Sequence, residues 1–229
     1  RPSGALEIRQ AGHEFDKMRK RILRHLNQRS EMLSGISHDL RTPLTRIKLQ
    51  LAIIENKDLS KKLSMDVDEM EKMLNEYLQF ASTGAKDKTE SFDLCKITQE
   101  IIEKYQNPKI KKIFKSEIFF NGRKNLIKRC INNLIDNSLK YGEKILVEIE
   151  KDKSNIFLYI DDDGPGIPEN EYKNIIKPFY KIDKSRSESK SSVGLGLAIS
   201  SDIIKSHGGD IKFAKSNLGG LKVIISLPF

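Results

Sequence analysis

The stretch "NNLIDNSLKYG", Asn132–Gly142, predicts a helix with two unlike faces. At about 100° per residue, Asn137 and Lys140 fall within about 40° of Asn133 on a helical wheel. The apolar side chains of the same helix fall on the other side, at Ile127, Ile131, Leu134 and Ile135. One face is therefore expected to pack on a core. The other is expected either to be solvated or to offer amide oxygens to a hard cation such as Mg²⁺ and an amine to phosphate.

Segments on both sides of this helix predict a sheet for it to cover. Strands are predicted at residues 115–122, 143–152, 155–164 and 219–228, where apolar and polar residues alternate. A second helix is predicted over residues 194–209, where glycines close the pattern. These elements favour an α/β layer with a mixed or antiparallel sheet.

Two glycine-rich stretches border the predicted sheet and the second helix. In "DDDGPGIP", residues 161–168, a strand ends at Asp162, whose carboxylate can accept a hydrogen bond from an exocyclic amine. Gly164 and Gly166 would let the backbone approach a ligand closely, although this stretch could also be a simple turn. In "SSVGLGLAIS", residues 191–200, glycines precede a helix N-terminus, which suits an anion but is weak evidence alone.

The first third of the chain has a different, heptad-like pattern. Apolar residues recur every three or four positions, at Phe15, Met18, Ile22, Leu26, Leu33, Ile36, Leu40, Leu44, Ile47, Leu51 and Ile54. After a polar break at residues 55–62, a second series follows at Leu63, Val67, Met70, Leu74, Tyr77 and Ala81. Two helices joined by a polar turn predict an antiparallel hairpin. Because one stripe on each helix buries too little surface, we expect a four-helix bundle formed by two chains.

The stretch "SHDLRTPL", residues 37–44, interrupts this pattern with a histidine and a proline. On the wheel, His38 lies opposite the apolar stripe, so an exposed histidine is expected and a core histidine is disfavoured. Thr42 shares the face of His38. Pro43 removes the backbone N–H that would bind the Asp39 carbonyl, which predicts a bend. Asp39 can also hold the tautomer of the imidazole, and the expected result is an exposed nucleophile.

The composition excludes several classes of protein. The chain has 229 residues, 38% of them hydrophobic, and lacks both an apolar run of 18 residues and a leader pattern, so we expect a folded chain without a membrane span or signal peptide. Cys95 and Cys130 have no metal-ligand spacing and are expected to be buried thiols of a reducing compartment. The formal charge of +9 is scattered and lacks an aromatic and basic platform, so nucleic-acid binding is not expected.

Basic residues are locally in excess near the beginning of the chain. Residues 1–30 contain Arg1, Arg9, Lys17, Arg19, Lys20, Arg21, Arg24 and Arg29 against the acids Glu7, Glu14 and Asp16. This excess suits a segment just inside a membrane, and equally a solvated helix face. Because the chain starts with Arg1 rather than Met, we expect a fragment of a longer protein.

The order of these motifs resembles the cytoplasmic core of two-component sensor histidine kinases, in which a HisKA dimerisation domain precedes an ATPase domain of the GHKL (HATPase_c) type. In this resemblance, "SHDLRTPLTRI" is the H box, "NNLIDN" the N box, "DDGPGI" the G1 box, "KPFYK" the F box and "VGLGLA" the G2 box. Within the family, the chain is most similar to the EnvZ-like kinases. The resemblance covers about residues 30–229, and residues 1–29 resemble less closely the last helix of a HAMP linker.

The resemblance implies a fold class and a division into domains. We expect an all-α dimerisation hairpin, which forms a four-helix bundle in the dimer, followed by an α/β sandwich ATPase domain of the Bergerat type. The expected boundaries are 1–29 for the HAMP-like helix, 30–84 for the HisKA domain, 85–91 for a linker and 92–229 for the ATPase domain. The resemblance also implies the cytoplasmic portion of a bacterial inner-membrane sensor, attached to the membrane through segments absent from this chain.

The resemblance assigns roles to individual residues. His38 would be the phosphoacceptor, Asp39 its polarising acid and Thr42 the residue that orients water for phosphatase activity. Asn137 would bind Mg²⁺, with Asn133 nearby. The remaining ATP-binding positions implied by the family are Lys140, Tyr141, Asp162, Gly164, Gly166, Ile167, Lys181, Arg186, Gly194, Leu195, Gly196 and Leu197, where Asp162 would accept from the adenine amine and Lys181 and Arg186 would belong to a lid.

The predicted function is ATP-dependent autophosphorylation of His38, with ATP and Mg²⁺ as cofactors. A homodimer would then pass the phosphoryl group to an aspartate of a response-regulator receiver domain and also act as its phosphatase. Two positions depart from the family pattern, Ile176 where the F box usually has Phe and Ser192 where the G2 box often has Gly, so we expect a repacked lid. The alternatives are an ATP-driven conformational machine with the same fold and a phosphotransfer scaffold whose nucleotide site has decayed.

Overall fold

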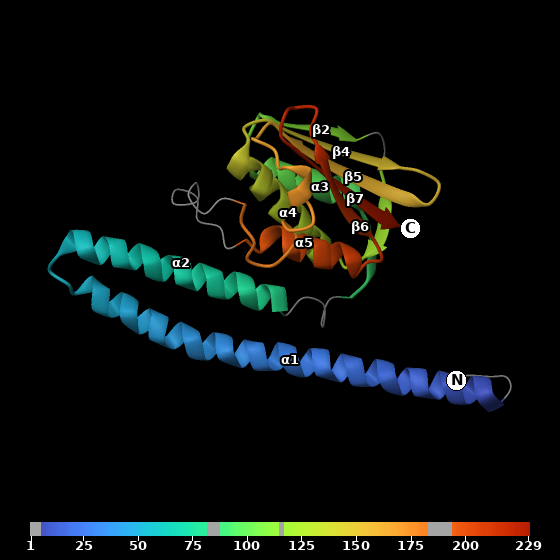
Figure 1. The fold of residues 1–229 in the computed structure, drawn as a ribbon, viewed down its shortest axis with the longest axis horizontal. Coiled ribbons are helices and arrows are strands. Elements are labelled where there is room, and N and C mark those ends of the chain that lie inside the picture. The colour runs from blue at the N-terminus through green and yellow to red at the C-terminus, as the bar shows by residue number, and fades with distance from the viewer. Residues whose placement is uncertain (1–5, 82–87, 115–116, 183–193) are drawn as a thin grey trace. The chain divides into compact units, whose positions relative to one another are not determined.

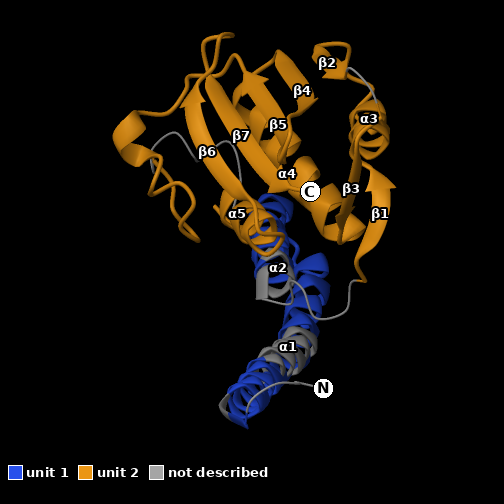
Figure 2. Cartoon of the chain, turned by 90° about the vertical axis from the view of Figure 1, so that its right-hand side faces the viewer, with its two compact units in different colours: residues 1–85 blue, residues 86–229 orange. Residues whose placement is uncertain are grey.

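The computed structural model describes residues 6–81, 88–114, 117–182 and 194–229. The chain divides into two compact units, Arg1–Ala85 and Lys86–Phe229 (Figure 2). The first unit is a helical hairpin and the second is a sheet covered by helices (Figure 1). Each unit is described by itself below.

The hairpin consists of α1, Leu6–Ala52, and α2, Lys57–Ala81. α2 begins after Asn56, whose side-chain Oδ1 accepts from the Leu59 backbone N–H at 3.1 Å and so satisfies one of the free donors of the first turn. Residues 57–62 were expected to be part of the polar break but belong to α2. Their charged sequence lacks an apolar pattern, and the capping bond of Asn56 allows the helix to begin there. α1 continues through Pro43 as one helix.

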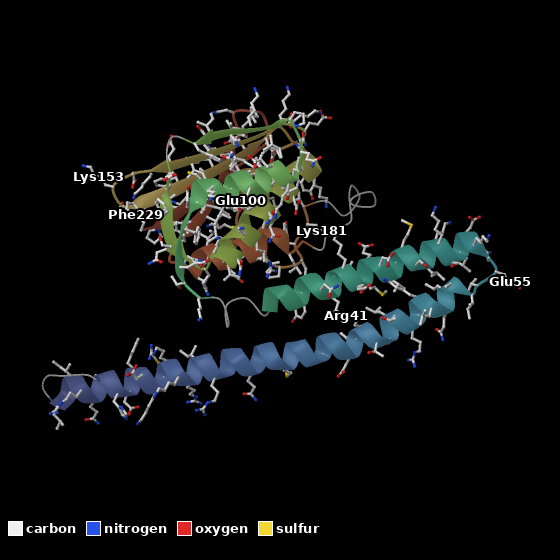
Figure 3. All side chains as sticks on the ribbon, turned by 180° about the vertical axis from the view of Figure 1, so that it is seen from behind. Arg41, Glu55, Glu100, Lys153, Lys181 and Phe229 are labelled. Carbon is white, nitrogen blue, oxygen red and sulfur yellow. The ribbon has the colours of Figure 1, made fainter. Side chains whose placement is uncertain are left out.

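Polar side chains fix the register of the two helices of the hairpin. The Arg41 guanidinium donates to Asn75 Oδ1 at 3.1 Å, and Arg41 points from α1 toward α2 (Figure 3). Further along, the Lys48 ammonium lies 2.7 Å from Asp68 Oδ1 and 2.5 Å from Glu71 Oε2. These contacts set how far α2 is shifted along α1, since each one joins a single position on each helix.

The apolar stripes of the hairpin remain largely exposed within one chain. Leu51 and Val67 are each 6% exposed, whereas Phe15, Met18 and Ile22 are 61%, 52% and 51% exposed. α1 also extends well beyond the end of α2 (Figure 1). The hairpin alone therefore leaves a long apolar surface in water, as expected for a bundle completed by a second chain. Among the described residues, no helix is both long and apolar enough to cross a membrane.

The second unit is built on a five-stranded mixed sheet with the order β2-β4-β5-β7-β6. Its strands are β2 (Ile110–Phe114), β4 (Ile145–Lys151), β5 (Asn155–Asp162), β6 (Asp210–Lys215) and β7 (Leu221–Pro228). β2 pairs with β4 in parallel and the other pairs are antiparallel. A small second sheet joins β1 (Glu90–Asp93) to β3 (Phe119–Gly122).

Three helices cover one face of this sheet: α3 (Leu94–Lys104), α4 (Lys124–Tyr141) and α5 (Gly196–Lys205) (Figures 1 and 2). The predicted apolar face of α4 is buried, with Ile127, Ile131, Leu134 and Ile135 at most 2% exposed. Alternate residues of β4, β5 and β7 are buried against the helices, including Val147, Ile160 and Val223. The unit is thus a two-layer α/β sandwich, which agrees with the α/β layer that the pattern favours and with the sandwich that the resemblance implies.

Three strands were not predicted. β2 and β6 lie at the edges of the sheet, where lysines and other polar residues weaken the alternation. β1 takes up residues 90 and 91 of the expected linker 85–91, because it pairs with β3 through a long-range contact that a polar stretch does not signal. The strand predicted over 115–122 begins at Phe119, and the helix predicted over 194–209 spans Gly196–Lys205.

His207 ties the beginning of α4 to the end of α5. Its Nε2 accepts from the Arg123 backbone N–H at 3.0 Å, while its Nδ1 lies 2.8 Å from the Ile203 carbonyl. Nδ1 must therefore carry the proton, so the imidazole is neutral in this arrangement. Burial, followed by the nearby Arg123 charge, lowers the pKa of His207, and the hydrogen bond to Ile203 partly opposes this shift.

This lowered pKa predicts acid sensitivity of the second unit. The unfolded chain binds a proton on His207 more readily than the folded one, so stability is fully present above the unfolded value of 6.5 and is lost as pH falls below it. Urea unfolding followed by tyrosine fluorescence reports mainly on this unit, since Tyr77 is the one tyrosine outside it. In wild type, the urea concentration at the unfolding midpoint should fall between about pH 7.5 and 5.5. We expect a smaller fall in His207→Gln and an unchanged fall in the matched control His13→Gln, since His13 is exposed. An equal fall in all three proteins contradicts the assignment.

Candidate functional site

The candidate site is built around Asp162, the last residue of β5. Asp162 is 3% exposed, and its Oδ1 accepts from the backbone N–H groups of Gly164 and Leu221, each at 3.0 Å. A third backbone contact closes the same turn, because the Gly220 N–H donates to the Asp162 carbonyl at 3.1 Å. Both bonds to the carboxylate use Oδ1, so Oδ2 is the oxygen that these N–H groups leave for another donor.

The environment of Asp162 controls its ionisation. Burial raises the pKa of this carboxyl group, and the two backbone hydrogen bonds oppose that shift. The next residue differs, because Asp163 Oδ1 accepts from the Lys144 and Glu143 N–H groups at 2.9 and 2.7 Å, and these bonds lower the pKa of Asp163. Two adjacent carboxylates therefore have separate tasks: Asp163 fixes the turn before β4, and Asp162 faces the helices.

Glycines allow three backbone segments to meet at Asp162. A Cβ on Gly220 would overlap Asp162 Oδ1 and come within 2.5 Å of the Gly164 nitrogen. A Cβ on Gly164 would lie 2.9 Å from the Tyr141 carbonyl oxygen, at the end of α4. Gly166 has φ +70°, a conformation that other residues rarely adopt, and lies against the Gly220 carbonyl. The turn after β5, the turn before β7 and the last turn of α4 thus converge.

Gly220 and the Leu221 N–H were not among the predicted site residues. The pair Gly219–Gly220 was predicted only as the beginning of the strand over residues 219–228. Their importance follows from the antiparallel pairing of β5 with β7, which places Lys222 opposite Asp161. The available signal was the glycine pair at the beginning of this predicted strand, because glycine in a strand often marks a close approach of another backbone segment.

The predicted polar face of α4 is half-buried in the structure. Asn133, Asn137 and Lys140 are all of intermediate exposure, and the Lys140 ammonium lies 5.2 Å from the centroid of the Tyr141 ring, which is 49% exposed. The Asn133 Nδ2 atom is buried without a hydrogen-bond partner among the described residues. A buried amide donor without a partner is costly, so this face suits a ligand with acceptor oxygens, such as a phosphate.

The donor set of α4 fits Mg²⁺ bound together with a nucleotide. Asn137 offers an amide oxygen, a ligand that this hard cation accepts. Within the part of the chain that the structure describes, no group of three or more His, Cys, Asp or Glu residues could hold a metal ion. Mg²⁺ that is bound through one or two protein oxygens takes its other ligands from phosphate and water.

The predicted G2 residues lie at the beginning of α5. Leu195 is fully buried, Gly196 opens the helix and Leu197 is half-buried. Gly194 has φ +77°, and its carbonyl accepts from the Phe179 N–H at 3.0 Å. This bond ties the F box to the helix entry.

The F box is held by a small polar cluster. Tyr180 donates to Glu171 Oε2 at 2.5 Å, and Asn174 donates to the same oxygen at 3.0 Å. Lys181 follows Tyr180 and is exposed on the surface of the second unit (Figure 3). Arg186 and Ser192 lie outside the described residues. Ile167 is half-buried, and Ile176, at the position where a Phe was expected, is also half-buried.

The H-box residues lie in the middle of α1. The backbone of His38 is helical, and its side chain lies outside the described part of the chain. Asp39 and Thr42 are exposed. The Thr45 hydroxyl donates to the Arg41 carbonyl at 3.0 Å. This bond lies close to Pro43, which has no N–H to donate to the Asp39 carbonyl.

The cradle around Asp162 predicts a large cost for a side chain at Gly220. Gly220→Ala should destabilise the second unit by roughly 3 kcal/mol or more, because a methyl group there displaces either the carboxylate or the backbone. Gly219→Ala is the matched control, since φ is +112° there but nothing lies within 4 Å of an added Cβ, so it should cost about 1–2 kcal/mol. Urea unfolding of both variants provides the measurement, and equal costs would contradict the steric argument.

Family models match both units of the chain. Residues 28–86 match the His Kinase A (phospho-acceptor) domain, and residues 122–229 match the histidine kinase-, DNA gyrase B- and HSP90-like ATPase. Among curated proteins, the chain is 37% identical over 227 residues to the sensor histidine kinase GtrS of Pseudomonas aeruginosa, covering 98% of this chain and 47% of that protein. It is 30% identical over 241 residues to the sensor histidine kinase CpxA of Escherichia coli K12, covering 99% of this chain and 52% of that protein.

Solved structures have the same fold. The full-length ShkA complex with AMPPNP aligns with a TM-score of 0.68 at 21% identity, covering 87% of this chain and 46% of that chain. The mycobacterial sensor histidine kinase MprB aligns with a TM-score of 0.54 at 24% identity, covering 62% of this chain and 97% of that chain. The chain spans about half the length of the curated relatives it matches. On the two ordered family matches and these relatives, the chain belongs to the sensor histidine kinase family.

Proposed function

We propose that this chain is the kinase core of a sensor protein that transfers the γ-phosphoryl group of ATP to His38. The observation that carries the proposal is the cradle of Asp162, a buried carboxylate held through Oδ1 by two backbone N–H groups. Its second oxygen suits the exocyclic amine of adenine, and the half-buried amides of α4 suit the phosphates. The match of residues 28–86 to a phospho-acceptor domain supports a histidine as acceptor.

The proposed reaction is a single phosphoryl transfer. A nitrogen of the His38 imidazole forms a bond to the γ-phosphorus while the bond from that phosphorus to the bridging oxygen breaks, and ADP leaves with the electron pair. Asp39, the next residue on α1, can accept the proton from the other nitrogen. Such transfer depends mainly on positioning and on neutralising charge, which Lys140 and Lys181 could supply.

The residues of α4 fit Mg²⁺ as the companion ion. Asn137 would bind it through the amide oxygen, and Asn133 would lie beside the phosphates. When bound, the ion neutralises charge on the phosphate oxygens. The glycines at 164, 166, 194 and 196, together with Ile167, Leu195 and Leu197, would shape the walls of the site.

A homodimer and a response-regulator receiver domain are the proposed partners. The exposed apolar stripe of α1 supports the dimer, because burying it against a second hairpin completes a four-helix bundle. Thr42 is exposed on the helix of His38 and could orient water in dephosphorylation of the regulator. The basic residues of α1 between Arg9 and Arg24 support a cytoplasmic location beside a membrane in the whole protein.

Two other functions are compatible with parts of the structure. An ATP-driven conformational machine would use the same nucleotide fold, and the family description of residues 122–229 includes DNA gyrase B and HSP90. The match of the preceding residues to a phospho-acceptor domain favours the kinase. A scaffold with a decayed nucleotide site is disfavoured by the intact cradle of Asp162.

Labelling with ATP tests the acceptor. Incubation with Mg²⁺ and ATP labelled in the γ-phosphate should give an acid-labile, base-stable label on the chain. His38→Gln should remove the label while ATP binding remains, because the nucleotide site lies on the other unit. His13→Gln, also on α1, is the matched control and should keep the label. A label that persists in His38→Gln contradicts the assignment of the acceptor.

Mixed dimers test the partner and the direction of transfer. Chains with His38→Gln and chains with Asn137→Ala should each be unlabelled alone, the first for lack of an acceptor and the second for lack of bound Mg²⁺ and ATP. If transfer runs between protomers, mixing and refolding the two should restore label on the Asn137→Ala chain. Absence of label in a verified mixed dimer indicates transfer within one chain. A separate measurement by light scattering tests the dimer, and a monomeric mass would contradict the predicted bundle.

A further inference from the structure

Ser138 is a buried polar residue of α4 to which neither the motifs nor the proposed mechanism gives a task. It is 1% exposed, and its hydroxyl Oγ has no hydrogen-bond partner of normal geometry among the described residues. A buried hydroxyl without a partner costs free energy, and alanine forms helices better than serine. On packing and helix propensity alone, alanine would be the better residue at this position.

The location of Ser138 suggests what the hydroxyl is for. Gly142 follows it by one turn, and the Gly142 N–H donates to the Ser138 carbonyl at 2.8 Å. A Cβ on Gly142 would lie 3.3 Å from Asp162 Cβ, so this side of α4 lies directly against the end of β5. Burial is the largest influence on the pKa of Asp162 and raises it, while the Ser138 hydroxyl makes a smaller contribution that lowers it. The two side chains are therefore neighbours, although their contact does not have the geometry of a normal hydrogen bond.

The backbone contacts of Asp162 leave Oδ2 open to further donors. Gly164 and Leu221 both donate to Oδ1, so the direction of Oδ2 depends on what else the carboxylate contacts. A donor on α4 would hold Oδ2 relative to the helix that also carries Asn137. Hydrogen bonds to a charged acceptor are among the stronger ones in a buried site.

We propose that Ser138 is a positioning residue of the nucleotide site, whose hydroxyl donates to the Asp162 carboxylate when adenine is bound and so aims the oxygen that accepts from the exocyclic amine. This inference rests on the proposed ATP binding. It assigns to Ser138 a part of the selectivity for adenine, exerted through Asp162. In the free protein the hydroxyl lacks a hydrogen bond of normal geometry, and in the complex with adenine it would gain one.

Ser200 provides a matched control. It lies on α5, is fully buried, and its hydroxyl also has no hydrogen-bond partner among the described residues. Its carbonyl accepts from the Cys130 thiol at 4.0 Å, so its surroundings are the packed α4–α5 contact. The two serines share burial and an unpartnered hydroxyl, and Ser138 differs by lying against Asp162.

The experiment measures affinity and stability together on the full chain. Binding of ATP and of purine riboside triphosphate, which has hydrogen in place of the amino group, is measured by calorimetry with Mg²⁺ for wild type, Ser138→Ala, Ser138→Cys and Ser200→Ala. Ser138→Cys keeps the volume and weakens the donor. We expect both Ser138 variants to lose about five- to tenfold in ATP affinity, the size expected for the net contribution of a typical hydrogen bond. Their affinity for the nucleotide without the amine should stay within about twofold of wild type.

The stability of the Ser138→Ala variant against urea should not fall together with its ATP affinity. Without nucleotide, Ser138→Ala should unfold at about the same urea concentration as wild type, because the lost hydroxyl makes no hydrogen bond of normal geometry there and alanine favours the helix slightly. Ser200→Ala should leave both affinities unchanged. The proposal is overturned if the Ser138 variants bind ATP as wild type does, if they lose affinity equally for both nucleotides, or if Ser138→Ala is destabilised while Ser138→Cys binds normally. Failure of wild type itself to bind ATP would instead overturn the proposed function.

Discussion

The arrangement of the second unit depends on one buried carboxylate and the backbone that surrounds it. Asp162 ends the central strand β5, and the N–H groups of Gly164 and Leu221 hold its Oδ1 at 3.0 Å. Burying a carboxylate without such donors would raise its pKa further and cost much of the stability of the unit. The donors can reach it because Gly164 and Gly220 have no side chain where the three segments meet. The pairing of β5 with β7 and the glycines at positions 164 and 220 are therefore both needed to bury this carboxylate.

The parts of this solution that depend on local pattern could be predicted from the sequence. The two faces of α4 follow from helical periodicity, and the structure buries Ile131 and Leu134 while Asn133 and Asn137 stay half-exposed. The helical hairpin and an α/β layer with a mixed or antiparallel sheet also follow from the spacing of apolar residues. In each case the pattern of apolar and polar residues can be recognised within a window of about twenty residues.

The parts that depend on long-range pairing could not be predicted in the same way. Gly220 matters because β7 returns beside β5, and nothing near residue 220 reports that neighbour. β1 was missed for the same reason, since it is defined by its pairing with β3. Ser138 is an intermediate case: the helical wheel places it on the apolar side, which is an unusual place for a hydroxyl, but its neighbour Asp162 becomes visible once α4 is packed on the sheet.

The two units divide the proposed chemistry between them. The proposed nucleotide site lies in the second unit, which has its own core. The hairpin carries the proposed acceptor, His38, and leaves Phe15, Met18 and Ile22 more than half exposed. The central claim is that the nucleotide site serves His38, and mass spectrometry under neutral conditions, after incubation with Mg²⁺ and ATP, tests it most directly. The account predicts a phosphoryl group on His38. ATP hydrolysis without a phosphorylated histidine, or a phosphoryl group on a different residue, would contradict it.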